Sequence, residues 1–281
     1  MEIKFFGAAK VVTGSNILIT TDKHKILLDC GMFQGSEHLE KLNYEEFDYN
    51  PGDIDFLILS HAHIDHSGRI PKLVKEGFKG RIITTKATYD LCKIMLIDSA
   101  NIQQSDVEWE NRKRRRAGKL PISPLYSIED AELSLKYFET YLYDQIIRIN
   151  EDLIVRFKDA GHILGSSIIE LWIKEKKEFT KLVFSGDLGM PGRPIINDPE
   201  FIDSADYLII ESTYGNRVHE DIKESTENLV NIINETVLRS GTVVIPSFAV
   251  GRTQELIYEL NRYYEYEKSI EEFMKIQNNL F

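Results

Sequence analysis

The 281-residue sequence predicts an α/β protein with a mixed sheet and helices packed outside it. Three observations carry this prediction. Short apolar runs recur along the chain and end in polar residues, which is typical of buried strands. Amphipathic, helix-favouring segments lie between these runs. Hydrophobic residues make up 42% and charged residues 28% of the chain, which is ordinary for a globular protein.

The apolar runs predict five buried strands that deliver polar side chains to one place. Each run is rich in β-branched residues or leucine, and Gly, Asp or Ser bounds it. Polar groups at the carboxyl ends of buried strands build sites along one rim of a sheet, so we expect one shared site. The runs cover residues 25–31, 54–61, 181–187, 206–212 and 242–247, and their polar ends are Asp29, His61, Asp187, Glu211 and Ser247.

Five segments between or after these runs favour helices. Residues 69–77 have a proline near the start and end in glycine. Residues 225–241 carry a capping-box pattern, "STEN", at the start and a glycine stop. The other three segments are residues 87–116, 127–143 and 253–267.

Composition narrows the class of protein. The net charge of −11 disfavours a protein held to nucleic acid by a general basic field, although it is compatible with a local basic groove. No apolar run is long enough for a bilayer span, and the first residues, "MEIKFFGAAKVVTG", lack a signal-peptide pattern. Cys30 and Cys92 are the only cysteines, which argues against a disulfide framework and favours a cytoplasmic location.

The stretch "LSHAHIDHSGR", residues 59–69, concentrates side chains that bind divalent metals. Alternate residues of an extended loop point the same way, so His61 and His63 can hold one ion while Asp65 and His66 turn toward a second. An ordinary polar surface loop is the alternative interpretation. Four ligand-type side chains directly after a buried strand disfavour it.

Two later turns supply further candidate ligands. His162 lies in "DAGHILGSS" and Asp187 in "FSGDLG", and glycine beside each permits close approach of the backbone. Either residue alone is equally well explained as an ordinary turn residue, but beside the first cluster both become predicted ligands. The predicted metal set is His61, His63, Asp65, His66, His162 and Asp187.

Seven segments give the chain a family resemblance: "FFGAAKVVTGSN", "LLDCGMFQG", "SHAHIDHSG", "DAGHILGSS", "FSGDLG", "IIESTYG" and "VVIPSFAVGRTQE". The chain resembles the metallo-β-lactamase superfamily, which the H-x-H-x-D-H motif marks. The sixth and seventh segments resemble its β-CASP branch of RNA-processing nucleases more closely. The resemblance implies an αβ/βα sandwich, incomplete at the C-terminus, over residues 1–212. It implies the N-terminal part of a β-CASP cap domain over residues 213–281.

The resemblance also implies a role for each matching residue. His61, His63 and His162 bind one zinc, Asp65 and His66 bind a second, and Asp187 bridges the two Zn²⁺ ions. Asp29 supports the ligands from behind. Glu211 assists proton transfer, normally through a later histidine, although from the residues alone it is a strand-end acid that caps a turn. Asp65, Asp187 and Glu211 are then the catalytic residues of a zinc-dependent hydrolase that cleaves RNA.

The chemistry of such a site agrees with hydrolysis. Two divalent ions about 3.5–4 Å apart lower the pKa of water to about 7 and offset the charge that develops on a phosphodiester. Ser247 and Arg252 lie at a predicted strand–turn–helix junction, where a helix N-terminus can hold a substrate phosphate. The basic run 112–116 could contact an RNA backbone, but a cationic helix end that the helix dipole stabilises is the simpler interpretation.

The chain departs from the family in one respect. β-CASP nucleases continue beyond the point where this sequence ends and bring two further histidines, a ligand of the second metal and the partner of Glu211. His219 is the last histidine here and matches neither motif. We therefore expect an N-terminal part of such a protein, with a weaker second metal site, exposed apolar surface, and low stability or homo-oligomerisation.

Two other functions stay open. A thioester or small phosphodiester hydrolase would use the same metal site, but the branch-specific segments disfavour it. A catalytically inactive metal- or RNA-binding fragment is favoured by the absent histidines and disfavoured by the six intact candidate ligands.

Overall fold

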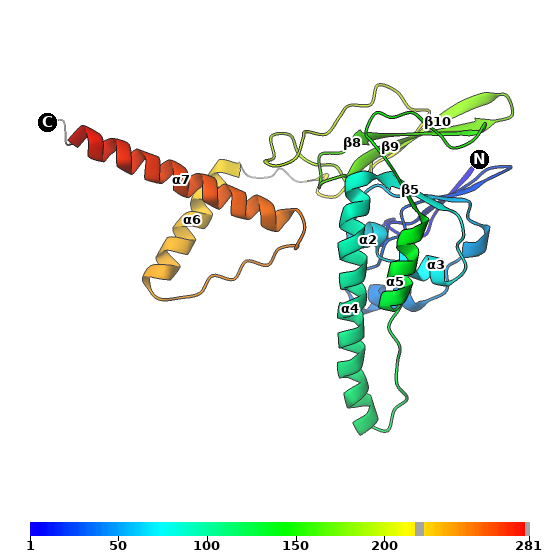
Figure 1. Ribbon diagram of the computed structural model, residues 1–281, viewed down its shortest axis with the longest axis horizontal. Coiled ribbons are helices and arrows are strands. Elements are labelled where there is room, and N and C mark those ends of the chain that lie inside the picture. Colours follow the sequence, from blue (N-terminus) through cyan, green and yellow to red (C-terminus); the bar gives the residue numbers. More distant parts are fainter. Residues whose placement is uncertain (217–221, 279–281) are drawn as a thin grey trace. The chain divides into compact units, whose positions relative to one another are not determined.

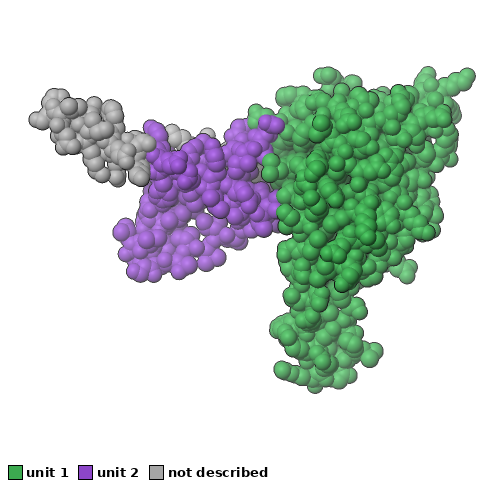
Figure 2. Space-filling view, viewed as in Figure 1, with its two compact units in different colours: residues 1–191, 198–211 green, residues 192–197, 212–281 purple. Residues whose placement is uncertain are grey.

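The computed structural model describes residues 1–216 and 222–278. The chain divides into two compact units (Figure 2). Unit 1 comprises residues 1–191 and 198–211, and unit 2 comprises residues 192–197 and the described residues from 212 onward. The main change of unit therefore falls between Glu211 and Ser212. The assignment of unit 2 to a β-CASP domain stays a prediction.

Unit 1 contains a six-stranded sheet in the order β1-β2-β3-β4-β5-β6. Its first three strands pair antiparallel, and the pairs from β3 to β6 are parallel. The strands β3 and β4 are the predicted runs that end near Asp29 and His61. The bounds are β1 Glu2–Phe5, β2 Ile17–Thr20, β3 Lys25–Leu28, β4 Phe56–Ile58, β5 Arg81–Thr85 and β6 Phe138–Tyr141.

A five-stranded sheet in the order β11-β10-β9-β8-β7 faces the first sheet. Its pairs are antiparallel except for β10 and β11, which run parallel. The strands β10 and β11 are the predicted runs that end near Asp187 and Glu211. The bounds are β7 Ile147–Arg148, β8 Leu153–Asp159, β9 Ser167–Glu175, β10 Glu178–Phe184 and β11 Tyr207–Ile209.

The core of unit 1 has two layers because alternate strand residues point to opposite faces. Ile26 and Leu28 of β3 pack with Val155 and Phe157 of β8 between the sheets. The intervening Leu27 packs on the other face, against the helices. Figure 1 shows α2 to α5 gathered on that face. The resulting layers confirm the predicted metallo-β-lactamase type of αβ/βα sandwich.

Four predicted helices are found where they were expected. The segment 69–77 contains α3, with Pro71 in its first turn, and 87–116 corresponds to the long helix α4. The bounds in unit 1 are α1 Glu37–Lys41, α2 Ile64–Ser67, α3 Ile70–Lys75, α4 Lys86–Arg116 and α5 Ile128–Ser134, with 3-10 turns at Leu42–Tyr44, Pro51–Asp53 and Leu135–Tyr137. Unit 2 contains α6 Ile222–Leu238 and α7 Arg252–Asn278.

The structure corrects several local predictions. The helix predicted over 127–143 ends at Ser134, and its second half forms β6, which gains parallel hydrogen bonds from β5. The strand predicted at 242–247 is absent, because the described part of unit 2 offers no second strand to pair with. The "STEN" pattern lies inside α6, which is already helical at Ile222, so it is not an N-terminal cap.

The strand β11 is not buried, contrary to expectation, because it forms the edge of its sheet. Leu208 and Ile210 are more than half exposed, and nearby Phe201 is almost fully exposed. The expected exposed apolar surface is thus present in unit 1. None of the described helices combines the length and the apolar character that crossing a lipid bilayer requires.

Candidate metal centre

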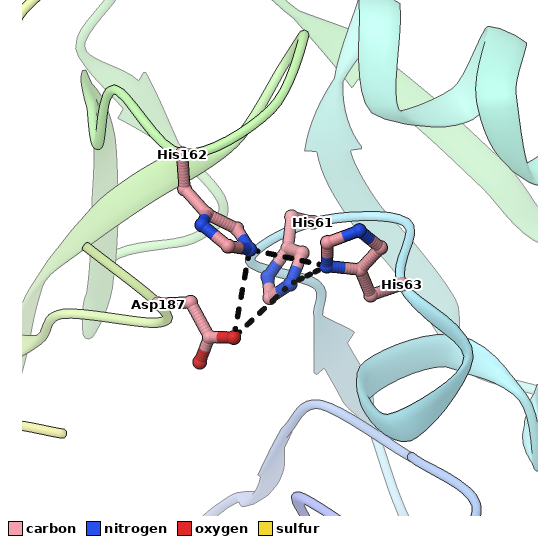
Figure 3. Close-up of side chains that lie close together, drawn as sticks. All are labelled: His61, His63, His162 and Asp187. Carbon is pink, nitrogen blue, oxygen red and sulfur yellow. Dashed lines mark hydrogen bonds and ion pairs between the residues drawn. The ribbon is translucent and has the colours of Figure 1, made fainter. Parts of the chain in front are cut away.

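The predicted site residues of unit 1 meet at one end of the two sheets. His61 follows β4, His63 precedes the first turn of α2, His162 lies in the turn between β8 and β9, and Asp187 follows β10. Figure 3 shows the three imidazole rings and the carboxylate directed toward a common point. Sequence segments about 100 residues apart therefore converge because strands of both sheets end at the same edge.

The first donor set has the dimensions of a tetrahedral metal site. His63 Nδ1 lies 3.2 Å from His61 Nε2 and 3.1 Å from His162 Nε2. Asp187 Oδ2 lies 3.7 Å from His61 Nε2 and 3.6 Å from His162 Nε2. A tetrahedral ion with metal–nitrogen bonds of about 2.0–2.1 Å has nitrogen–nitrogen edges of about 3.4 Å. One N or O atom from each of the four residues therefore fits one divalent ion.

The second donor set shares Asp187 with the first. Asp187 Oδ1 lies 3.2 Å from His66 Nε2, while Oδ2 faces the other histidines. Asp65 Oδ2 is 3.8 Å from the same His66 nitrogen. One oxygen of the Asp187 carboxylate therefore faces each donor set. The structure thus brings all six predicted ligands together.

Asp29 holds the second donor set from behind. Its buried carboxylate accepts hydrogen bonds from the Ser15 hydroxyl at 3.0 Å, the Ser60 amide at 2.8 Å and the Ser60 hydroxyl at 2.9 Å. His66 Nδ1 lies 2.7 Å from Asp29 Oδ2, so the ring donates from Nδ1 and presents Nε2 to the site. A partner of this kind fixes the tautomer and the ring orientation of a metal-ligating histidine.

Glycine lets the site loops approach one another closely. A Cβ atom on Gly31 would lie 1.6 Å from the Asp65 carbonyl oxygen, and one on Gly189 would lie 1.5 Å from the Gly161 carbonyl oxygen. The first contact packs the loop after β3 against α2. The second, with the hydrogen bond from Gly189 N to Ala160 O at 2.8 Å, packs the Asp187 loop against the His162 turn.

Burial and mutual proximity set the protonation of the ligands. Burial lowers the pKa of His61 well below its usual value, and the neighbouring histidines lower it further. Burial also lowers the pKa of His162. Burial alone would raise the pKa of Asp187, but the hydrogen bond and the charge of His66 hold it below its usual value. Neutral imidazoles beside an ionised carboxylate are the forms that bind a metal.

His66 behaves differently from the other histidines. Burial lowers its pKa, but Asp29 and Asp187 outweigh that effect and raise the pKa well above its usual value. This direction favours the protonated ring, which lies between the carboxylates of Asp29 and Asp187. A metal ion at Nε2 would take the place of that proton and its charge.

The remaining predicted site residues lie as follows. The Glu211 carboxylate accepts a hydrogen bond from the Leu188 amide at 2.6 Å, so it holds the backbone next to Asp187. Ser247 bonds to Thr253 at 2.7 Å within unit 2, and Arg252 begins α7 and pairs with Glu255 at 2.9 Å. Position 219 lies outside the described residues.

The two serines that donate to Asp29 are not among the residues predicted from the sequence. Ser60 carries a weak signal, because it stands between a strand end and the first histidine of the motif. Ser15 carries none. Its place is set by the backbone bonds from Ser15 N to Asp65 O and from Gly31 N to Ser15 O, both 2.8 Å.

The sequence is similar to those of several known proteins. Residues 9–143 match the metallo-β-lactamase superfamily. Ribonuclease TTHA0252 of Thermus thermophilus is 36% identical over 260 residues, which cover 92% of this chain and 54% of that protein. Transcription termination factor FttA of Pyrococcus abyssi is 31% identical over 277 residues, which cover 94% of this chain and 40% of that protein.

A solved structure, the subclass B3 metallo-β-lactamase BJP-1 of Bradyrhizobium japonicum, aligns with a TM-score of 0.42 and 14% identity over 94% of this chain and 90% of that one. The chain spans about half the length, or less, of the two curated relatives above.

The sandwich and the His/Asp group at its loop end define a metal-binding protein of the metallo-β-lactamase class. The chain resembles the metallo-β-lactamase superfamily, whose family model matches residues 9–143. Its relatives confirm the resemblance to the β-CASP branch of RNA-processing nucleases. The metallo-β-lactamase type of fold, together with the donor set, implies a divalent metal.

Proposed function

We propose that this chain supplies the metal centre of a zinc-dependent hydrolase that cleaves RNA phosphodiester bonds. The observation that carries the proposal is the Asp187 carboxylate, which directs one oxygen to His66 and the other to His61 and His162. A shared carboxylate of this kind suits two ions rather than one. The similarity to ribonuclease TTHA0252 of Thermus thermophilus supports RNA as the substrate.

Zinc is the ion that best matches the donors. Three imidazoles and a carboxylate are borderline ligands, and the spacing of the first set suits tetrahedral coordination. We assign His61, His63, His162 and Asp187 to one Zn²⁺ and Asp65, His66 and Asp187 to a second. When bound, two such ions provide a nucleophile from water at neutral pH and offset charge on the phosphoryl oxygens.

Other residues of the chain have separate roles beside the metal ligands. Asp29 orients the His66 ring. Glu211 holds the Leu188 amide and so keeps Asp187 aimed between the two donor sets. We also propose that Glu211 assists proton transfer and that Ser247 and Arg252 contact substrate phosphate in the whole enzyme. The exposed apolar residues beside β11 support self-association of the chain.

The test is an RNA cleavage assay on the zinc-loaded protein and on two variants. Asp187→Asn keeps the shape of the side chain but removes the shared charge, so we expect cleavage to fall by more than about 100-fold. Asp48→Asn removes an exposed carboxylate that is not one of the predicted site residues, and it should leave the rate unchanged. Metal analysis of each preparation reports how many zinc ions remain.

Three results would contradict the proposal. If Asp187→Asn cleaves RNA as fast as the unsubstituted protein, the metal centre takes no part in the reaction. Hydrolysis of a thioester or a small phosphodiester without cleavage of RNA would favour the alternative hydrolase. Two bound zinc ions with no hydrolysis of any of these substrates would identify an inactive metal- or RNA-binding protein.

A further inference from the structure

The distal half of α4 forms an arm that projects from unit 1 (Figure 1). The first half of the helix packs on the body through Thr88, Cys92, Leu96 and Ala100, at intervals of four residues. No residue of α4 after Ala100 is buried. We define the arm as residues 101–124, which include most of the segment that returns along the helix. Packing against the core therefore does not stabilise the second half of α4.

The arm is nonetheless a built structure. Asn111 exchanges two hydrogen bonds with the backbone of Ile122, each 2.8 Å long. Arg114 Nε donates to the Leu120 carbonyl at 2.6 Å. Nearer the body, the Leu125 amide donates to the side chain of Gln103 at 3.2 Å. The returning segment is thus fixed antiparallel to the helix along the length of the arm.

The tip of the arm concentrates positive charge in an otherwise acidic protein. The net charge of the chain is −11, yet residues 111–124 contain no Asp or Glu. Hydrogen bonds to carbonyl oxygens near the helix end account for Arg114 and Arg115, which is the capping role expected of such residues. They do not account for the four other cations of the tip, all exposed: Arg112, Lys113, Arg116 and Lys119.

An exposed aromatic ring lies beside these cations. Trp109 is 54% exposed, and Lys113 Nζ lies 3.0 Å from the centre of its indole ring. Leu120, on the returning segment, is 82% exposed. Cations that neutralise phosphates beside an aromatic face that stacks on bases are the means by which proteins hold single-stranded nucleic acid.

The base of the arm adjoins the metal centre. Thr85 and Thr88, at the start of α4, both donate to the Gly165 carbonyl oxygen, at 2.7 and 2.8 Å, in the turn that carries His162. At about 1.5 Å per residue, the cationic tip lies about 40 Å further along the helix. A stacked strand covers that distance in about twelve nucleotides at about 3.4 Å each.

We propose that the arm binds the sugar–phosphate backbone of the RNA substrate about twelve nucleotides from the metal centre. This inference rests on the proposed function. The tip is an RNA-binding site distant from the metal centre, which only longer RNA can reach. It contacts none of the metal ligands.

The test compares two fourfold charge variants on RNA oligonucleotides of about 30 and about 8 nucleotides. The arm variant replaces the four exposed cations of the tip: Arg112→Gln, Lys113→Gln, Arg116→Gln and Lys119→Gln. The control variant removes the same charge elsewhere on unit 1, at exposed lysines: Lys79→Gln, Lys136→Gln, Lys176→Gln and Lys177→Gln. Circular dichroism and thermal melting check that both variants fold.

For the arm variant we expect binding of the long RNA to weaken about tenfold or more, because phosphate contacts are lost. The slope of log K against log salt should fall by about 0.7 for each lost contact with a single strand. Binding and cleavage of the short RNA should stay unchanged, since the short RNA does not reach the tip. The control variant should match the unsubstituted protein on both RNAs.

Equal losses on long and short RNA, equal losses in the control variant, or no loss at all would overturn the inference. Loss of binding to phosphatidylserine vesicles with unchanged binding of long RNA would assign the arm to a membrane surface instead. Failure of the proposed function has a different signature, namely RNA that binds through the arm but is not cleaved by the zinc-loaded protein.

Discussion

The Asp29 carboxylate lies in the protein interior, where an unpaired charge would be costly. Four hydrogen bonds, from Ser15, from the amide and hydroxyl of Ser60, and from His66, compensate for its loss of water. Its φ of 59° is left-handed, a conformation that Asp and Asn adopt more readily than most residues. The residue therefore couples the loop after β3 to the second donor set.

Asp29→Asn should weaken metal binding while preserving the fold. Asparagine tolerates the same backbone conformation, but it is neutral and its NH₂ group cannot accept from the serines. We expect zinc affinity at the second donor set to fall by about 10–100-fold. Competition with a chromophoric chelator measures this, with Asp48→Asn as the control. An unchanged affinity would show that His66 is oriented without help from position 29.

At the residue scale, ligands that stand in one motif could be predicted from the sequence. His61, His63, Asp65 and His66 fall within six positions, so their convergence requires only a short turn. Ser15 could not be predicted, because a serine that serves a residue 14 positions away leaves no local pattern. Its role depends on the packing of two loops.

At the scale of elements, the second sheet carries a row of charged side chains on its outer face. Glu170 of β9 is 1% exposed, and it pairs with Arg156 of β8 at 2.5 Å and with Lys181 of β10 at 2.6 Å. Both cations also lie over the ring of Trp172. This row ties three strands together by means other than apolar burial.

Glu170→Gln should destabilise the protein in a pH-dependent manner. Burial would raise the pKa of Glu170, but hydrogen bonds and charges of Arg156 and Lys181 outweigh this effect and hold the pKa below its usual value. The stabilisation is therefore complete above the unfolded-state pKa of about 4.3 and is lost as the pH falls through the lower folded-state pKa. We expect the variant to lose about 1.5–3 kcal/mol at pH 6.

Urea unfolding of both proteins between pH 6 and pH 3 measures this difference. Glu178→Gln, at an exposed position on β10, is the control and should have no effect at either pH. If the loss of unfolding free energy in Glu170→Gln stays constant down to pH 3, the side chain stabilises the protein through its shape rather than its charge.

Elements that local patterns specify were predicted well, and those that depend on pairing were not. The helix α5 begins directly after Ser127, where the predicted helix starts, and a capping box of Ser127 and Asp130 stabilises that start. The following residues 138–141 are helical by pattern but extended in the fold, because β5 offers them a parallel partner. Conversely, residues 242–247 read as a strand, yet the described part of unit 2 contains no strand beside them.

At the scale of the whole molecule, the candidate centre links two halves of unit 1. His61 and His63 belong to the loop that leaves the first sheet, whereas His162 and Asp187 belong to loops of the second. Apolar side chains fill the layer between the sheets, and at the loop end the Ser167 amide donates a hydrogen bond to the Ser60 carbonyl at 3.0 Å. A metal bound by all four residues would therefore cross-link the sheets at their open end, so metal binding and folding of unit 1 must be thermodynamically coupled.

Zinc should accordingly raise the melting temperature of the protein. Free zinc at 100 times its dissociation constant stabilises the folded state by about 2.7 kcal/mol, provided the unfolded chain does not bind it. For a unit of this size that corresponds to a shift of about 5–10 °C. Differential scanning calorimetry with zinc and with a chelator measures it. Asp187→Asn should lose most of the shift and Asp48→Asn none. If zinc does not change the melting temperature of the unsubstituted protein, the four side chains do not act as one site. Any ligand that bridges the two sheets must oppose their separation.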